Sequence, residues 1–524
     1  METKQILEIW NKLPFSNFED EDKKAEWRKY ALELLLSLNK GNTGLIADTG
    51  TGKTIMALLV FEAMGIRTLF LAPTVILTKQ HADLYKAISG SDAVIVTGQK
   101  VKRDWNQKEL IIATPHVFLA DRKKGLINEG DFDLLIVDEM HKGQGNYPYV
   151  SIANLFNKVN KKILCLSASP GANHEEISWM EKIYQIKTWV TAEIEKPLTK
   201  NRLIKAELSD ELKTVAPYFK KVYLETLKKL CQVFEAQKKE VIVPLDEENP
   251  FLTQVDNDKL EKLVDALEKP EFYEAKYLFA KQYKLSYLYR ILMTEGYASF
   301  LNYICLKMTK DQSKAALSIL NNNEFRAVYS LIKETQIKKL HPKEEKLLEV
   351  IKEMSWKNKS MLIFVSSKLT AKYLSELVNS RGYKSDVLFG GKDKSLKNQS
   401  RVIEEFSTQK LQIIFATSVV EEGLSLPDIE VVIHYNQPST EIARLQRNGR
   451  TGRFHEGLVV FLITDIPYEN ALYFATLAKL KKMKSIFYES ARQEVRENKA
   501  RVKKRKVDLT GQLTLMFTDT ELLF

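Results

Sequence analysis

A glycine-rich loop near the start of the chain holds the residues best suited to chemistry. It reads Ala47-Asp48-Thr49-Gly50-Thr51-Gly52-Lys53-Thr54, follows the apolar pair Leu45-Ile46 and precedes a helical pattern at Ile55–Met64. A strand, a loop and a helix in this order direct backbone N–H groups and a helix N-terminus at phosphate oxygens. We expect a nucleotide site at Thr49, Gly50, Thr51, Gly52, Lys53 and Thr54, with Lys53 on the β- and γ-phosphates and Thr54 on Mg²⁺. An ordinary glycine turn is the alternative, since Ala47 replaces the first glycine of the usual pattern.

Two adjacent carboxylates follow an apolar stretch farther along the chain. Leu134–Val137 leads into Asp138-Glu139-Met140-His141. The carboxyl ends of strands are where α/β sheets bind ligands. We therefore expect Asp138 to hold Mg²⁺ and Glu139 to orient or deprotonate an attacking water in phosphoryl transfer. A solvated acidic turn is a poor alternative after so apolar a strand.

A third candidate segment, near the end of the chain, carries three arginines. It reads Gln446-Arg447-Asn448-Gly449-Arg450-Thr451-Gly452-Arg453. An arginine finger must approach a γ-phosphate, and Arg450 and Arg453 are the candidates, with Gln446 included in the catalytic set. Such a segment alone is more often a solvated loop or a general nucleic-acid contact. Together with the other two motifs it implies an ATP site shared between two lobes.

The elements that must position these residues are two α/β lobes. Short apolar runs that alternate with helical stretches are typical of parallel strands buried on both faces. In the first lobe they are Thr68–Ala72, Ala93–Thr97, Leu110–Ala113, Leu134–Val137 and Ile163–Ser167. In the second they are Met361–Val365, Asp386–Phe389, Gln412–Ala416, Val431–His434 and Leu458–Ile463.

A different pattern separates the lobes. Leu-, Lys-, Tyr- and Ala-rich stretches such as Tyr273–Tyr289 and Lys314–Lys338 show helical spacing. We predict a RecA-like first lobe at 1–200, a helical insertion at 201–340, a RecA-like second lobe at 341–480 and a basic tail at 481–524. The tail is either a basic helix or a disordered arm.

Composition narrows the class of protein. The chain has 524 residues, enough for several domains, and a formal net charge of +11, which favours a polyanionic partner. The apolar runs are too short to cross a bilayer, and Met1-Glu2-Thr3-Lys4 does not resemble a signal peptide, so we expect a cytoplasmic or nucleoid-associated protein. The three cysteines, Cys165, Cys231 and Cys305, lack the spacing of a zinc site or disulfide framework.

The three motifs, in this order, resemble those of superfamily 2 DExH helicases and, within them, the Hef/FANCM branch. Further resemblance lies in Ala72-Pro73-Thr74, Thr97-Gly98, Thr114-Pro115, Ser167-Ala168-Ser169-Pro170-Gly171, His341-Pro342-Lys343 and Ala416–Leu424. The resemblance implies nucleic-acid contacts at Pro73, Thr74, Thr97, Gly98, Thr114, Pro115, Ser366 and Thr417. It implies coupling of ATP state to strand contacts by His141, Ser167 and Ser169, and a nucleotide contact at Gly423. For a single threonine, a helix cap or turn is the alternative.

Three departures from the family pattern matter. Ala31 stands where relatives have the glutamine that reads adenine, and Ser425 stands where they have an aspartate. Nothing after Leu480 resembles the nuclease that often follows in the Hef branch. If branched DNA is cut, we expect a separate structure-specific nuclease to cut it.

The resemblance implies an ATP- and Mg²⁺-dependent helicase or translocase that unwinds or branch-migrates forked and branched DNA in replication-fork repair or recombination. An RNA or double-stranded-RNA helicase of the Dicer and RNA-sensor type is one alternative. An ATP-switched nucleic-acid-binding scaffold is another. The insertion suits phosphate and stacking contacts through pairs such as Lys276-Tyr277 and Tyr283-Lys284, although an amphipathic helix would look similar. The terminal Gln512, Leu515, Met516 and Phe517 only faintly resemble a sliding-clamp peptide.

Overall fold

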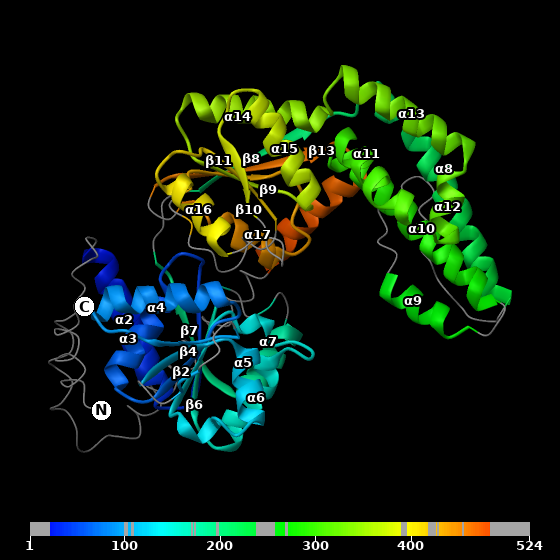
Figure 1. Ribbon diagram of the computed structural model, residues 1–524. Coiled ribbons are helices and arrows are strands. Elements are labelled where there is room, and N and C mark those ends of the chain that lie inside the picture. The colour runs from blue at the N-terminus through cyan, green and yellow to red at the C-terminus, as the bar shows by residue number, and fades with distance from the viewer. Residues whose placement is uncertain are drawn as a thin grey trace, which may run out of the picture.

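A computed structural model describes residues 21–98, 103–105, 109–168, 171, 174–194, 199–236, 257–267, 271–388, 396–417, 426, 429–452 and 455–482. Figure 1 shows two α/β lobes, one above the other, and a group of helices that extends from the upper lobe. Residues 483–524, which hold nearly all of the predicted basic tail and the terminal Gln512, Leu515, Met516 and Phe517, lie outside the described residues, as do Ser169, Gly423, Ser425 and Arg453.

The first lobe is built on a seven-stranded parallel sheet with the strand order β3-β4-β2-β5-β6-β1-β7. Its strands are β1 (Asn42–Ala47), β2 (Thr68–Leu71), β3 (Val94–Val96), β4 (Leu110–Ala113), β5 (Leu134–Val137), β6 (Lys162–Ser167) and β7 (Ile186–Ala192). Its helices are α2 (Glu21–Leu38), α3 (Lys53–Met64), α4 (Val75–Ser89), α5 (Pro115–Lys123), α6 (Pro148–Lys158) and α7 (His174–Tyr184), with 3₁₀ turns η1 (Glu129–Asp131) and η2 (Met140–Lys142).

The apolar strands of this lobe bury both of their faces. In β5, Leu134 and Ile136 enter one hydrophobic cluster, whereas Leu135 and Val137 enter the cluster on the other side. Successive side chains of a strand point to opposite faces, so an unbroken apolar run is buried only when helices cover both sides of the sheet. Because the strands are parallel, their carboxyl ends all lie at one edge of the sheet. The polar residues that follow the strands lie at that edge.

The second lobe has a six-stranded parallel sheet with the order β10-β11-β9-β12-β13-β8. Its strands are β8 (Thr199–Ala206), β9 (Met361–Phe364), β10 (Ser385–Leu388), β11 (Ile413–Ala416), β12 (Val431–His434) and β13 (Gly457–Thr464). Its helices are α14 (Pro342–Trp356), α15 (Lys368–Ser380), α16 (Leu396–Ser407) and α17 (Glu441–Asn448).

Strand β8 corrects the predicted domain boundary. We predicted that the first lobe ends at residue 200 and that the helical insertion begins at 201, but β8 pairs with β13 along its whole length, from Thr199↔Gly457 to Ala206↔Thr464. It is an edge strand whose side chains are mostly exposed or half-buried. Without an apolar run it carries little sequence signal, and its partner strand defines it.

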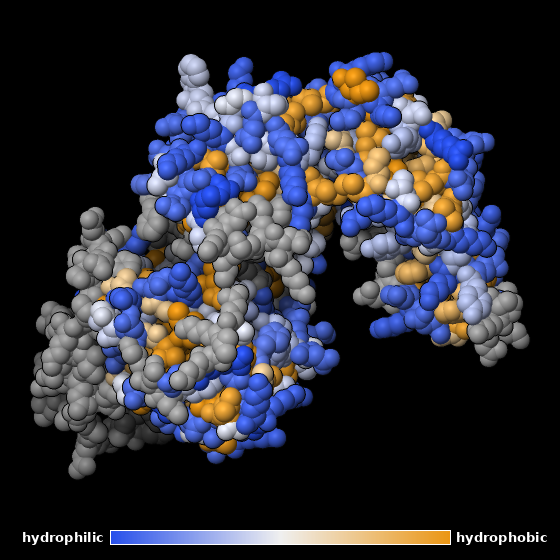
Figure 2. All heavy atoms as spheres, in the orientation of Figure 1, coloured by the Kyte–Doolittle hydropathy of each residue, from blue (hydrophilic) through white to orange (hydrophobic). Residues whose placement is uncertain are grey.

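The helices between β8 and α14 form one unit, which we call the helical arm. They are α8 (Asp210–Ala236), α9 (Asn257–Asp265), α10 (Glu271–Thr294), α11 (Tyr297–Leu306), η3 (Met308–Lys310), α12 (Lys314–Leu320) and α13 (Asn323–Lys338). Their buried side chains share one hydrophobic cluster, to which Ile466 of the second lobe also belongs. The arm projects from the second lobe, and its far end stands away from the first lobe in Figures 1 and 2.

Candidate ATP site and nucleic-acid interface

The glycine-rich loop, residues 47–54, lies between β1 and α3 and has the shape of a phosphate cradle. Gly50 and Gly52 adopt left-handed conformations, with φ of 82° and 96°, which glycine tolerates without steric cost. The buried Lys53 ammonium donates to the carbonyl oxygens of Ala47 at 2.9 Å and Asp48 at 3.2 Å. A buried cation at the N-terminus of a helix suits a phosphate ligand, so these residues fit a nucleoside triphosphate.

Trp27, on α2, supports this loop and was missed by the sequence analysis. Its indole Nε1 donates to the Thr51 carbonyl at 2.7 Å, and a Cβ added to Gly52 would lie 2.4 Å from the same nitrogen. A lone tryptophan upstream of a loop gives no signal of that contact in one sequence. Ala31, one helical turn later, is fully buried. Its side chain packs α2 against the core of the first lobe.

Asp138 follows β5 and is held by a second residue that the sequence analysis missed, His81 on α4. The His81 Nε2 to Asp138 Oδ2 distance is 2.8 Å, and both side chains are buried. Burial by itself raises the pKa of Asp138, but the hydrogen bond and charge of His81 and the charge of Lys53 outweigh it, so the pKa is lowered. The carboxylate is thus kept ionised, as a Mg²⁺ ligand requires.

Glu139, His141 and Ser167 form a polar chain between β5 and β6. Glu139 has a left-handed backbone, with φ of 51°, a conformation that is costly for a residue with a Cβ and that clusters at functional sites. The His141 Nδ1 lies 3.3 Å from Glu139 Oε2 and 3.1 Å from Ser167 Oγ. The structure therefore brings together Glu139 and two of the residues predicted to couple the ATP site to strand contacts.

The arginine segment, residues 446–453, meets the glycine-rich loop of the other lobe. A Cβ added to Gly449 would lie 2.5 Å from the Cβ of Thr49, so the backbone at Gly449 lies directly against that loop. Gln446 and Arg450, in the same segment as Gly449, are buried. Arg447 is used within the second lobe, where it donates to the Asn436 carbonyl at 3.1 Å and lies over the Phe364 ring.

The predicted strand contacts of the first lobe lie at the carboxyl edge of its sheet. Thr97, Gly98, Thr114 and Pro115 follow the neighbouring strands β3 and β4, and Pro73 and Thr74 follow β2. The Thr74 hydroxyl accepts the Leu77 N–H at 3.2 Å and caps α4, whereas Thr114 begins α5 without such a bond. In the second lobe, Ser366 and Thr417 follow β9 and β11 at the corresponding edge.

Most of the basic and aromatic pairs predicted to bind nucleic acid from the arm are engaged within it. Lys284 pairs with Asp311 at 2.6 Å, the Tyr277 hydroxyl donates to Ser318, and Tyr287 packs against Tyr303. On α10, Tyr273 and Tyr283 expose more than half of their surface, 58% and 51%. Among the described aromatic residues of the arm, these two rings are the most exposed.

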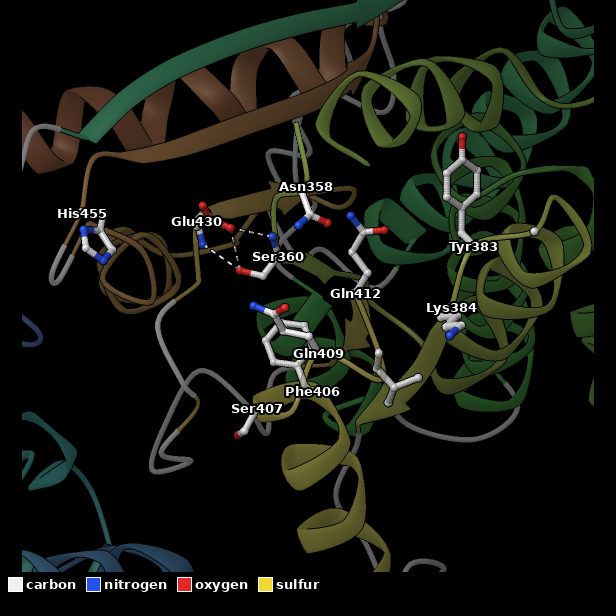
Figure 3. Close-up of a pocket in the computed structure, with 12 residues that line it drawn as sticks. Asn358, Ser360, Tyr383, Lys384, Phe406, Ser407, Gln409, Gln412, Glu430 and His455 are labelled. Atoms are coloured by element: carbon white, nitrogen blue, oxygen red, sulfur yellow. Dashed lines mark hydrogen bonds between the residues drawn. The ribbon is translucent and has the colours of Figure 1, made fainter. Parts of the chain in front are cut away.

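A pocket of about 540 Å³ lies at the opposite, amino edge of the second sheet (Figure 3). Its lining includes Ser360, Lys384, Gln412 and Glu430, which stand just before β9, β10, β11 and β12. The Glu430 carboxylate accepts the Ser360 N–H at 2.8 Å, and its backbone carbonyl accepts the Thr451 hydroxyl at 3.0 Å. The pocket therefore borders the end of the arginine segment but contains none of the predicted site residues.

Comparisons with known proteins agree with this geometry. Residues 20–172 match the family model "Type III restriction enzyme, res subunit", and residues 342–455 match "Helicase conserved C-terminal domain". The first range contains the glycine-rich loop and Asp138-Glu139, and the second contains the whole arginine segment. The fold, the motif order and both models are those of superfamily 2 helicases.

Three relatives and one solved structure show which helicases the chain is similar to. A Methanocaldococcus jannaschii protein, provisionally named an ATP-dependent RNA helicase, is 29% identical over 88% of this chain and 61% of its own length. The ATP-dependent DNA helicase mph1 of Neurospora crassa is 24% identical over 83% of the chain and 41% of its own length. The mouse Fanconi anemia group M protein homolog is 25% identical over 84% of this chain and 25% of its own length. The chain thus spans between a quarter and about three fifths of these relatives.

The crystal structure of the Pyrococcus furiosus Hef helicase domain shares the fold, with a TM-score of 0.61 and 24% identity over 85% of this chain and 97% of that one. Within that superfamily, this chain is similar to proteins of the Hef/FANCM type. No helix among the described residues is long and apolar enough to cross a membrane.

Proposed function

We propose that this chain is an ATP-driven motor that unwinds or branch-migrates forked and branched DNA. The observation that carries the proposal is the approach of Gly449 to Thr49, which sets the arginine segment of one lobe against the glycine-rich loop of the other. A site divided between two lobes can be opened and closed by the nucleotide, and closure is what moves such a protein along a strand.

Each part of the site has a role in phosphoryl transfer. The loop amides and Lys53 bind the phosphates, Thr54 and Asp138 would hold Mg²⁺, and Glu139 orients the attacking water and accepts its proton. Mg²⁺ neutralises charge on the phosphate oxygens when it is bound. Arg450 stabilises the charge on the γ-phosphate, and Arg453 and Gln446 complete the catalytic set.

We propose that a row of hydrogen-bonded side chains couples the ATP site to the nucleic-acid strand. The chain Glu139–His141–Ser167 joins the end of β5 to the end of β6, next to the edge that carries Thr74 and Thr114. Contacts at these residues and at Thr417 position a strand by its phosphates without reading its sequence. The proposal places the protein in the cytoplasm or at the nucleoid, with a separate nuclease for any cleavage.

The experiment is an ATPase panel with forked DNA, Holliday junction, single-stranded DNA and duplex RNA. We expect the forked and branched DNAs to stimulate hydrolysis most. Lys53→Ala should abolish turnover, whereas Lys352→Ala, an exposed lysine on α14, should not. Strongest stimulation by duplex RNA would favour the RNA-helicase alternative, which the name of the Methanocaldococcus relative raises. ATP hydrolysis without sustained movement in a translocation assay would favour the scaffold.

A further inference from the structure

Glu295 connects the helical arm to the second lobe. It follows the last residue of α10 and is 4% exposed. Its carboxylate accepts the hydroxyl of Ser366 at 2.5 Å and the hydroxyl of Thr370 at 2.5 Å. Both donors belong to the second lobe, where Ser366 follows β9 and Thr370 lies in the first turn of α15.

A buried carboxylate costs stability unless it is well hydrogen-bonded. Short O–H···O⁻ bonds are the strong kind, and Glu295 also lies at the N-terminus of α15, where the helix dipole favours a negative charge. The first turn of α15 has no acidic residue of its own. Glu295 therefore supplies from the arm the anion that this helix lacks.

Ser366 is held from two sides by these contacts. Its N–H donates to the Asn436 side-chain oxygen at 2.9 Å, and its hydroxyl donates to Glu295. The residue is nevertheless exposed to solvent. With both of its donors engaged, Ser366 cannot also donate to a strand phosphate, so its part in strand binding is to set the position of the backbone that enters α15.

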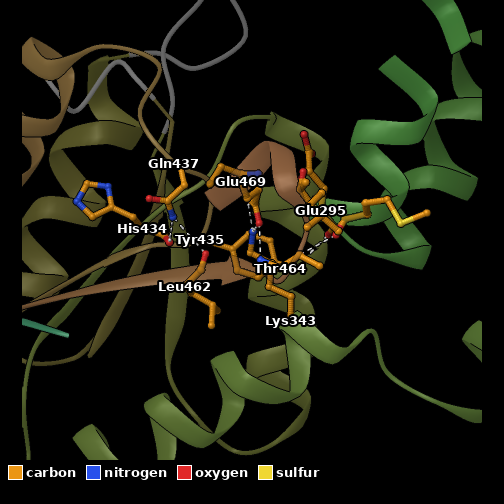
Figure 4. Close-up of polar contacts among 12 residues, drawn as sticks. Glu295, Lys343, His434, Tyr435, Gln437, Leu462, Thr464 and Glu469 are labelled. Atoms are coloured by element: carbon orange, nitrogen blue, oxygen red, sulfur yellow. Dashed lines mark hydrogen bonds and ion pairs between the residues drawn. The ribbon is translucent and has the colours of Figure 1, made fainter. Parts of the chain in front are cut away.

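Neighbouring bonds fix the same end of the arm. The Tyr435 hydroxyl donates to the Glu295 carbonyl at 3.1 Å, and the Thr464 hydroxyl donates to the Met293 carbonyl at 2.7 Å. Figure 4 shows Glu295 close to the buried ion pair of Lys343 and Glu469, whose atoms approach to 2.8 Å. The arm is thus fastened to β12, β13 and the loop after β9 at one place.

We propose that Glu295 is a positioning residue for the nucleic-acid contact of the second lobe, which it sets through Ser366 and thereby ties to the arm. The inference rests on the proposed function, in that it assumes a strand passes the loop at 366–368. A strand held at this loop and the position of the arm are then linked by one carboxylate.

The test compares Glu295→Ala, Glu295→Gln, Ser366→Ala and the double variant Glu295→Ala/Ser366→Ala. The readouts are the concentration of forked DNA that half-saturates ATPase stimulation, the maximal rate and the melting temperature. Glu295→Ala should raise the half-saturating concentration about fivefold, equivalent to about 1 kcal/mol, with the maximal rate kept. Glu295→Gln keeps a hydrogen-bond acceptor and should restore binding to within about twofold. Glu274→Ala, an exposed glutamate on the same helix, is the matched control and should change nothing.

Glu295→Ala/Ser366→Ala should be no worse than Ser366→Ala, because Glu295 acts through that residue. The inference is overturned by an unchanged half-saturating concentration in Glu295→Ala, by effects that multiply in the double variant, or by a lower melting temperature with equal loss of maximal rate. If no nucleic acid stimulates the wild-type protein, the proposed function fails with it. If the wild type responds and Glu295→Ala responds equally, only this inference fails.

Discussion

At the scale of single residues, the ATP site depends on partners that no motif names. Burial alone would raise the pKa of Asp138. The hydrogen bond and charge of His81 and the charge of Lys53 instead lower this pKa below its usual value. His81 is separated from Asp138 by 57 residues and lies on α4. Its ring holds one carboxylate oxygen, so it orients Asp138 as well as keeping it charged.

His81→Ala should therefore impair hydrolysis in a pH-dependent way. Loss of the hydrogen bond and charge raises the pKa of Asp138, so the acid limb of the pH–rate profile should move to higher pH. We expect the rate at neutral pH to fall about tenfold or more, as for the loss of an orienting partner. His116 is an exposed histidine on α5. His116→Ala is the control, and its ATPase rate, measured without nucleic acid, should match that of the wild type. An unshifted profile in His81→Ala would count against this role.

At the scale of elements, two titratable residues, His341 and Glu344, are buried at the start of α14, and their pKa values are shifted in opposite directions. Burial raises the pKa of Glu344 from 4.5 to about 7. Burial, together with the charge of Lys343, lowers the pKa of His341 from 6.5 to about 3. They also cap the helix, since the His341 N–H donates to Glu344 at 3.1 Å.

These shifts predict a pH dependence of unfolding. Between pH 4.5 and 7 the folded chain keeps a proton on Glu344 that the unfolded chain loses, so Glu344 makes stability fall as pH rises. Between pH 3 and 6.5 the unfolded chain protonates His341 and the folded chain does not, so His341 makes stability rise. Each slope is at most about 1.4 kcal/mol per pH unit, and from 4.5 to 6.5 they oppose one another.

Glu344→Gln should remove the first slope and leave the second. Denaturant unfolding from pH 4 to 8 should then show stability rising to about pH 6.5, and a variant more stable than wild type at pH 8. Glu345→Gln, the exposed neighbour, should keep the wild-type profile. Parallel profiles for Glu344→Gln and wild type would contradict the assignment.

The contact between α17 and the glycine-rich loop gives a second prediction at this scale. Gly449→Ala would place a methyl group 2.5 Å from the Thr49 Cβ, too close for either to remain in position. Because φ of Gly449 is −69°, the backbone tolerates alanine and the effect is steric. We expect ATP hydrolysis to fall at least tenfold through separation of the lobes.

Thr49→Gly in the Gly449→Ala background removes the clashing side chain and should recover part of the rate. Steady-state ATPase of the single and double variants measures this. A Gly449→Ala protein with wild-type turnover would show that the two segments do not approach during catalysis.

At the scale of the whole molecule, the arm joins the second lobe and extends beyond it (Figure 1). In Figure 2 its surface shows hydrophilic residues interspersed with hydrophobic ones, and its basic residues can contact phosphates without sequence preference. Tyr273 and Tyr283 add exposed rings on α10. Under the proposed function, the arm would hold a second part of a branched substrate while the lobes act on a strand.

Replacing Tyr273 and Tyr283 together with alanine should weaken binding of forked DNA. Stacking of a base on an aromatic ring contributes about 1–3 kcal/mol, so the preference for forked over single-stranded DNA should fall about fivefold or more, measured by competition. The rings are exposed, so the melting temperature should hardly change. Trp356→Ala, at a 91% exposed residue of the second lobe, is the control. An unchanged preference would exclude stacking on α10.

Much of this fold could be predicted from the sequence, because buried parallel strands require unbroken apolar runs. Leu110–Ala113, Leu134–Val137 and Val431–His434 are strands with the predicted bounds. The predicted helical stretch Lys314–Lys338 is two helices, since Asn322 caps α13 by accepting the Phe325 N–H. Strand β8 was assigned to the wrong domain because edge strands lack an apolar run.

By itself, the sequence determined which residues can bind phosphate and metal, since glycine, lysine and adjacent carboxylates have that chemistry wherever they are placed. The tertiary structure decided what those residues touch. Four contacts join segments far apart in the chain: His81 with Asp138, Trp27 with the glycine-rich loop, Gly449 with Thr49, and Glu295 with Ser366. Such contacts leave no local pattern, because they arise from how the sheets and helices pack and not from the spacing of residues along the chain.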